Sequence, residues 1–240
     1  MIRLAREYQR LFLLSGTPAS GAGESVRALV LEVSRPAGWQ PLGAVWQGVQ
    51  ADLGLPAPAI AVNGIDGLQL WFSLAAAVDA VQGRALLEGL RLQYMADVPP
   101  HRVAMQATPV PVPIPQPVGV EGQWSAFVAG DLAPLFEESP WLDLPPSEDG
   151  QAELLSRVVS IEPAAFLFAL QLLQGLRDAR AEVALVEARP AGRSTAHPAA
   201  FAAAHPAAAQ FLLAVMQDEA VPLALRVEAA KALMPYGPAR

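Results

Sequence analysis

Residues 59–74, AIAVNGIDGLQLWFSL, limit the folds open to this chain more than any other stretch. Two apolar runs flank a short turn that holds Gly64 and Gly67. Glycine reaches the positive φ angles of a tight β-hairpin without steric cost. The second run alternates Leu or Phe with other side chains, which is the period of a strand with two different faces. The pattern predicts two antiparallel strands, 59–62 and 68–74, with one face buried and the other partly polar.

Elements of both types flank this hairpin. Residues 26–33, VRALVLEV, are rich in β-branched side chains and predict a strand, and residues 101–108 return to the same character. Residues 39–55 and 78–95 place apolar side chains three or four positions apart, which predicts two helices. The order of elements predicts an α+β or mixed α/β fold, in which helices pack on a mixed sheet.

The rest of the chain divides by composition. We expect an α/β body over residues 1–148 and a helical extension over 149–188, broken near Pro163. An alanine- and proline-rich linker is predicted over 189–208, followed by a two-helix module over 209–240. The domain organisation is therefore one main body with a smaller helical C-terminal region.

A proline-rich segment, PVPVPIPQPV, occupies residues 109–118. Proline has no N–H to donate, so the segment predicts an extended edge or polyproline II connector rather than a central strand. The alternative is a ligand for a proline-recognition domain. Farther along the chain, proline also follows His197 and His205. This order favours the start of a helix at each position. The alternative is a metal site that uses both histidines.

The charge balance and the absence of cysteine exclude several classes of function. The net charge is −7, and residues 1–188 carry 11 basic and 20 acidic groups. This balance opposes a broad nucleic-acid surface on the body. The chain has no cysteine, which excludes thiolate chemistry and disulfides. The longest apolar candidate, 163–176, contains two glutamines and is interpreted as a buried helix. With an amphipathic first helix over 1–16, these features predict a cytoplasmic protein without a membrane partner.

The strand LVLEVS (29–34), an intervening helix and the glycine turn leading into LQLWFSL resemble the core of the archaeo-eukaryotic primase-polymerase superfamily. The likeness covers about residues 26–108. It implies a sheet whose first strand carries two carboxylates that hold divalent metal. It also implies a histidine after the hairpin turn that contacts nucleotide phosphates.

On this chain the family's two carboxylate positions fall on Glu32 and Ser34, and its histidine falls on Gln69. Two-metal phosphoryl transfer needs several anionic oxygens to hold its ions, and Glu32 alone does not supply them. Gln69 donates hydrogen bonds but carries no positive charge. The resemblance thus implies a degenerate site with no catalytic residue, no metal and no cofactor.

The hairpin end has two interpretations. In the structural one, Trp71 is a packing residue and Glu32 a partly exposed strand residue or one end of an ion pair. In the functional one, the end is a remnant nucleotide groove whose tryptophan is available for base stacking. The candidate groove residues are Glu32, Ser34, Asn63, Asp66, Gln69 and Trp71.

Residues 210–236 resemble a short helical module of phage small-terminase-like proteins, through the pattern FLLAVMxD…PLxLRxEAAKALxPY. The resemblance implies phosphate or partner contacts by Arg226 and Lys231. The alternative is a two-helix cap on the body.

Together these observations predict a non-catalytic nucleic-acid-associated or scaffolding protein of a mobile-element, plasmid or phage-derived locus. One alternative is a nucleotidyl-transfer enzyme that uses Mg²⁺ or Mn²⁺, with Glu32, Asp66 and Asp131 converging within roughly 6 Å. Another is a protein-interaction adaptor with no nucleotide site. The expected partners are nucleic acid at the C-terminal tail or a protein, and a homo-oligomer is left open.

Overall fold

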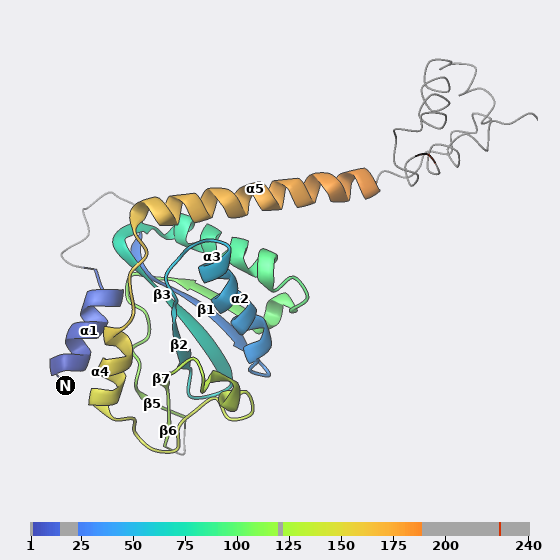
Figure 1. Ribbon diagram of the computed structural model, residues 1–240. Helices are drawn as coiled ribbons and strands as arrows, with labels where there is room; N and C mark the ends of the chain where they lie inside the picture. Colours follow the sequence, from blue (N-terminus) through green and yellow to red (C-terminus); the bar gives the residue numbers. More distant parts are fainter. Residues whose placement is uncertain (1, 15–23, 120–121, 189–225, 227–240) are drawn as a thin grey trace, which may run out of the picture. The chain divides into compact units, whose positions relative to one another are not determined.

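A computed structural model describes residues 2–14, 24–119, 122–188 and 226 (Figure 1). The chain divides into two compact units, residues 1–181 and 182–240. The first unit holds the sheet and its helices. The predicted linker and C-terminal module fall in the second unit and, apart from residue 226, lie outside the described residues.

Helices and strands of the body alternate along the chain much as the sequence predicts. In order they are α1 (Ile2–Phe12), β1 (Ser25–Ser34), α2 (Trp39–Ala51), β2 (Ala59–Val62), β3 (Gly67–Asp79), α3 (Ala80–Tyr94), β4 (Val103–Ala107), β5 (Pro117–Val118), β6 (Gln123–Trp124), β7 (Ala126–Val128), α4 (Glu148–Ser156) and α5 (Pro163–Ala188), with short 3-10 helices at Pro100–Arg102 and Ala133–Phe136.

Five strands form the main sheet, in the order β4-β1-β3-β2-β7. Each neighbouring pair is antiparallel, and β5 and β6 form a separate two-stranded sheet. The predicted hairpin is confirmed as β2 and β3, with Val62 opposite Leu68. The α+β class predicted from the sequence is confirmed as well, but the main sheet is antiparallel throughout and not the mixed sheet that was predicted.

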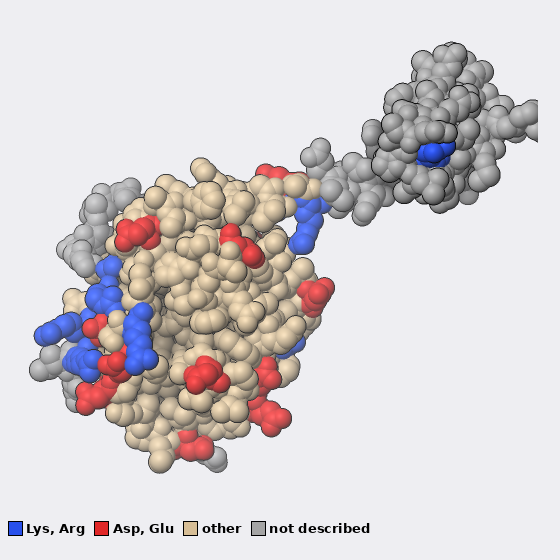
Figure 2. Space-filling model, in the orientation of Figure 1, with Lys and Arg blue, Asp and Glu red and all other residues tan. Residues whose placement is uncertain are grey.

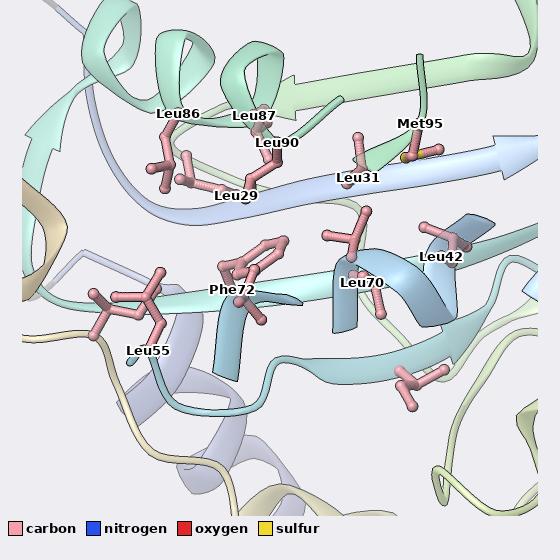
Figure 3. Close-up of a cluster of buried hydrophobic side chains, with 14 of the residues drawn as sticks. Leu29, Leu31, Leu42, Leu55, Leu70, Phe72, Leu86, Leu87, Leu90 and Met95 are labelled. Carbon is pink, nitrogen blue, oxygen red and sulfur yellow. The ribbon is translucent and has the colours of Figure 1, made fainter. Parts of the chain in front are cut away.

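Helices cover both faces of the sheet (Figure 1). On one face, side chains of β1 and β3 pack against α2, α3 and the start of α5. Figure 3 shows part of this core, in which strand and helix side chains interdigitate; its labelled members include Leu29, Leu31, Leu70, Phe72, Leu86 and Leu90. All six are at most 1 % exposed. Burial of such side chains is the main favourable term in folding, at roughly 1.5–3 kcal/mol each.

The opposite face of the sheet lies beneath α1 and α4. Phe12 and Trp71 meet edge to face with ring centroids 5.1 Å apart, and Trp71 and Phe127 do so at 5.5 Å. Leu155 of α4 completes this second core. The hairpin strand β3 is therefore buried on both faces, contrary to the prediction of one partly polar face. The residues predicted to be partly polar, Gln69, Trp71 and Ser73, are 7 %, 2 % and 2 % exposed.

The body extends beyond the boundary predicted at residue 148. Leu155 of α4 lies in the second core, while Phe166 and Leu173 of α5 are buried in the first. Since both helices contribute core side chains, the compact unit continues through Ala181. The first helix, α1, is confirmed, and it packs along α4 and β3.

The predicted break near Pro163 is confirmed between α4 and α5. Here Ile161 donates its N–H to the carbonyl of Ser73 at 2.7 Å and accepts from the N–H of Ala75 at 2.9 Å. These bonds tie the chain to the end of β3 just before α5 starts. The helix predicted to be buried over 163–176 is buried on one side only: Phe166 is 1 % exposed, whereas Phe168 is 59 % exposed. Among the described residues, no helix is both long and apolar enough to cross a membrane.

The proline-rich segment forms a connector, as predicted, which bends at 109–110 and at 114–115 and ends in β5. Ile114 is buried against the second core, whereas Val110 and Val112 are 74 % and 56 % exposed. Tyr8 donates its hydroxyl to the carbonyl of Val112 at 3.3 Å. The segment is thereby held against the same face of the sheet as α1.

The edge strand β7 is closed by a side chain. Gln151 of α4 accepts from the N–H of Phe127 at 2.8 Å and donates its Nε2 to the carbonyl of Phe127 at 2.9 Å. A side-chain amide thus makes the two bonds that a neighbouring strand would make. Gln151 is 5 % exposed, so this edge is blocked against pairing with another chain.

We expect Gln151→Ala to lower the free energy of unfolding by about 2 kcal/mol, since it leaves two backbone groups of Phe127 without partners. Chemical denaturation followed by tryptophan fluorescence measures the loss. Gln151→Glu keeps the acceptor but removes the donor, and it should also destabilise the protein. Wild-type stability for both variants would show that water replaces the amide at no cost.

Candidate functional site at the hairpin end of the sheet

The predicted groove residues come together where β1 meets the β2–β3 turn. Glu32 and Gln69 are directly opposite each other on β1 and β3, and Ser34 is opposite Gly67. Asn63 occupies the turn that links β2 to β3. The cluster of residues predicted from the sequence is therefore present, but these side chains form hydrogen bonds mainly with one another.

A chain of hydrogen bonds runs from the aromatic core to this corner. The indole Nε1 of Trp71 donates to Oε1 of Gln69 at 2.8 Å. Nε2 of Gln69 in turn donates to Oε2 of Glu32 at 2.6 Å. Both ends of the Gln69 amide are thus used, and a buried amide in this position satisfies an indole and a carboxylate together.

Asn63 holds the corner from the turn. Its Oδ1 accepts from the backbone N–H groups of Ile65, Asp66 and Gly67 at 2.8, 3.0 and 2.9 Å. Only an oxygen can accept these three bonds, so the orientation of the amide is fixed. Its Nδ2 then donates to Oε1 of Glu32 at 3.1 Å and to Oδ1 of Asp66 at 3.2 Å. The NH₂ group therefore lies between the two carboxylates, where a shared cation would have to bind.

An arginine neutralises the outer carboxylate. Nε of Arg35 donates to Oδ2 of Asp66 at 3.0 Å, and the backbone N–H of Arg35 donates to the Asp66 carbonyl at 3.3 Å. Arg35 has a φ of 59°, in the left-handed region that costs a non-glycine residue roughly 1–2 kcal/mol. The two bonds to Asp66 hold Arg35 in this conformation.

Asp131 lies far from the corner. Val128 pairs with Ile60, so β7 runs away from the turn and Asp131 follows its distal end. At 3.3 Å per residue, Val128 is about 10 Å from Asn63 along the sheet, and Asp131 lies beyond it, in the turn that follows β7. The convergence of Glu32, Asp66 and Asp131 required by the enzyme alternative is therefore wrong. Within the described ranges, no three His, Cys, Asp or Glu side chains are grouped to hold a metal ion.

A small cavity of about 170 Å³ adjoins the network. Gln69, Trp71 and Gln106 lie on its sheet side, and Ile114 and Gln116 of the proline-rich segment close it from above. Nucleotide-sized ligands occupy pockets of about 300–1,000 Å³. The cavity is therefore too small for the nucleotide groove predicted at this place.

Trp71 does not present a face for base stacking. Tyr8, Phe12 and Phe127 surround its ring at centroid distances of 6.1, 5.1 and 5.5 Å. Its interpretation as a packing residue agrees with this environment. Burial raises the pKa of the neighbouring Tyr8 well above its usual value. The aromatic cluster is therefore uncharged at neutral pH.

The predicted tail contacts are only partly described. Arg226 is a half-buried helical residue of the second unit, and Lys231 lies outside the described residues.

Two features near the sheet edge were not predicted from the sequence. One is the closure of β7 by Gln151, for which no local pattern gives a signal. The other is an open hollow of about 360 Å³ beside β7, with Trp46 and Phe127 among its apolar walls and Asp131 and Arg157 as its charged members. Only the fold brings these residues together.

Comparison with known proteins adds no family to this description. No protein-family model matches the chain, and no curated protein matches its sequence significantly.

Proposed function

We propose that this chain is a non-catalytic, nucleic-acid-associated protein of a mobile-element, plasmid or phage-derived locus, built on a scaffold that resembles a primase-polymerase core. In this proposal, the corner that carries catalysis in that superfamily serves to stabilise the fold.

One observation carries the non-catalytic part. The Nδ2 group of Asn63 lies 3.1 Å from Glu32 and 3.2 Å from Asp66, as a neutral donor between two carboxylates. Paired cations about 3.5–4 Å apart need more anionic oxygens than these, and they need the space that the amide fills. Because this corner lacks both the charge and the space for two-metal nucleotidyl transfer, we assign it a structural role.

The charge distribution supports a narrow contact with a polyanion. Figure 2 shows basic side chains gathered over α1, with acidic ones among them. Five of the eleven arginines of residues 1–188 belong to this group. Arg3, Arg6 and Arg10 lie on α1 itself. Arg27 donates to the Arg10 carbonyl, and Arg157 pairs with Glu153, the ion-pair partner of Arg3. Two glutamates, Glu7 and Glu153, pair with members of this set. Glu148 of α4 also lies beside α1, so five positive charges stand against three negative ones and leave an excess of two.

Arg6 provides a clean test of this basic group. It is exposed, and the structure shows neither a hydrogen bond nor an ion pair for its side chain among the described residues. Arg84 matches it in these respects but lies on α3, which covers the other face of the sheet. Replacing either arginine should leave the fold intact.

We expect Arg6→Ala to weaken binding of a fluorescent single-stranded DNA about three- to tenfold in anisotropy titrations, while Arg84→Ala changes it little. The salt dependence should also become shallower, by about 0.7 in the log–log slope for each lost phosphate contact on a single strand. Duplex DNA and RNA of the same length identify the preferred nucleic acid.

Equal binding by the two variants would remove α1 from the contact surface. Absence of any salt-dependent binding to all three nucleic acids would contradict the proposed association. That result would favour the adaptor, for which the exposed Val110 and Val112 of the proline-rich connector offer a contact surface.

A further inference from the structure

The open hollow of about 360 Å³ lies where β2 begins and β7 ends. Its volume falls within the range of about 300–1,000 Å³ that nucleotide-sized ligands occupy, unlike the cavity at the corner. Val128 of β7 pairs with Ile60 of β2 in its wall, and the last turn of α4 lies beside them. Two strands and a helix therefore form the walls of the hollow.

The floor of the hollow is apolar and partly aromatic. The Trp46 indole is fixed there because its Nε1 donates to the Pro58 carbonyl at 3.3 Å. A Cβ added to Gly130 would lie 3.8 Å from Cζ2 of Trp46 and 3.6 Å from Cδ1 of Ile60. A larger side chain at position 130 would cover these atoms, so glycine keeps this part of the hollow open. A flat apolar group, such as a nucleobase, can lie against the indole.

Asp131 supplies an unpaired carboxylate to the hollow. It follows Gly130, is exposed, and forms neither a hydrogen bond nor an ion pair with any other residue that the structure describes. An ionised carboxylate accepts hydrogen bonds through both oxygens and donates none. The ligand that matches it best carries two adjacent N–H groups on one edge.

Arg157 supplies a cation on the α4 side of the same hollow. Its side chain is 74 % exposed and donates from Nη2 to Oε1 of Glu153 at 3.2 Å. A guanidinium has five N–H donors, so further donors remain for a phosphate oxygen. Arg157 also belongs to the basic group beside α1. The hollow therefore borders the surface that we propose contacts nucleic acid.

We propose that this hollow binds one unpaired guanine of a single-stranded nucleic acid, an inference that rests on the proposed function. Guanine has two adjacent donors, N1–H and N2–H₂, on its Watson–Crick edge, and they match the two oxygens of Asp131. Adenine and cytosine each place an amino group beside an acceptor nitrogen, and thymine has a single N–H between two carbonyls. The base lies along Trp46, while the phosphate of the same strand bonds to Arg157.

The same arrangement favours single strands over duplexes. In a duplex, the Watson–Crick edge of guanine is bonded to cytosine, and neighbouring bases cover its faces. A paired guanine must be extruded before it can enter the hollow, which costs free energy that an unpaired base does not lose. Duplex DNA should therefore bind only through its phosphates.

Anisotropy titrations of the full chain with two fluorescent single strands test the proposal. One strand contains thymine only, and the other has a single central guanine among the thymines. The wild-type protein should bind the guanine strand about tenfold more tightly, as expected for one base that is both stacked and hydrogen-bonded. Hypoxanthine in place of guanine lacks N2–H₂, so that strand should lose part of the preference.

Three variants separate the parts of the site. Gly130→Leu fills the hollow and Asp131→Ala removes the acceptor, so each should abolish the preference for guanine. Gly175→Leu and Asp97→Ala are the matched controls, since an added Cβ at Gly175 meets no atom within 4 Å, Asp97 is exposed and unpaired among the described residues, and neither lines the hollow. Arg157→Ala should weaken both strands alike, because phosphate contacts carry no sequence information. Circular dichroism checks that each variant folds.

Two results would overturn this inference and leave the proposed nucleic-acid association standing. One is salt-dependent binding of both strands with equal affinity by the wild type. The other is a preference for guanine that survives in Gly130→Leu. Failure of both strands to bind at low salt would contradict the association itself, and this inference with it.

Discussion

Gln69→Glu should lower the free energy of unfolding by about 4 kcal/mol at pH 7, because it places a second carboxylate against Glu32 in a largely buried site. The present contact is a hydrogen bond of 2.6 Å from Nε2 of Gln69 to Oε2 of Glu32. The substitution replaces that donor with an oxygen while keeping the acceptor for the Trp71 indole. Repulsion between the carboxylates therefore dominates the loss.

The pH dependence separates this mechanism from simple loss of packing. When a proton binds to one of the two carboxylates, the O–H···O bond between them is restored. The folded variant binds this proton more readily than the unfolded chain does, so its stability rises as the pH falls toward about 4–5. Denaturant titrations at several pH values measure the recovery relative to the wild type.

Gln69→Leu is the matched control. It removes the partner of the indole and one of the two partners of the Glu32 carboxylate, and should cost about 3 kcal/mol. No new titrating group is added, so the difference from the wild type should vary much less with pH. A Gln69→Glu protein with wild-type stability at pH 7 would show that the corner tolerates a second charge.

Asn63→Asp has the second large effect. The side chain keeps an oxygen for the N–H groups of Ile65, Asp66 and Gly67. It loses the Nδ2 donor and places a third carboxylate beside Glu32 and Asp66. We expect a loss of about 3–4 kcal/mol at pH 7 without divalent cations, from like-charge repulsion and two lost charge-assisted bonds.

The same substitution creates a set of three carboxylates suited to a hard cation. Mn²⁺ at a hundredfold excess over its dissociation constant would return about 2.7 kcal/mol of stability. Asn63→Ala loses the amide without adding a carboxylate, so it should be destabilised but unresponsive to Mn²⁺. Recovery of both variants by Mn²⁺ would place the metal at a different site.

Much of the sheet can be predicted from local sequence. The glycine turn and the alternation over 59–74 define the β2–β3 hairpin, and the β-branched run over 26–33 defines the strand beside it. These signals are short-range, since turn chemistry and side-chain period act within a few residues. The helical spacing over 39–55 and 78–95 likewise predicts α2 and α3 to within a few positions at each end.

The alternating pattern of β3 does not predict that other segments cover its second face. Gln69 and Ser73 look like solvent-facing positions in an alternating strand, yet Ser73 is covered by α1 and Gln69 lies beneath the proline-rich segment. Ser73 shares its hydroxyl with the carbonyl of Leu11 and the hydroxyl of Ser160, at 2.7 Å each. Such contacts join residues 62 and 87 positions apart, so only tertiary packing determines them.

The corner itself was predicted by position but not by bonding. The resemblance grouped Glu32, Asn63 and Gln69 in one groove, and the pairing of β1 with β3 places Glu32 opposite Gln69. The orientation of the Asn63 amide by three backbone N–H groups was not predicted, because it depends on the turn geometry. This orientation decides whether the carboxylates face a donor or an open site.

Titration of Mn²⁺ into the wild-type protein, with unfolding free energy as the readout, tests most directly whether the corner can hold a cation. Because the Asn63 amide lies between Glu32 and Asp66, we expect Mn²⁺ to change the stability of the wild type no more than that of Glu32→Gln. Asn63→Asp should instead gain about 2 kcal/mol or more. A clear gain in the wild type that disappears in Glu32→Gln would contradict a non-catalytic corner, because it would show that these carboxylates already hold a cation.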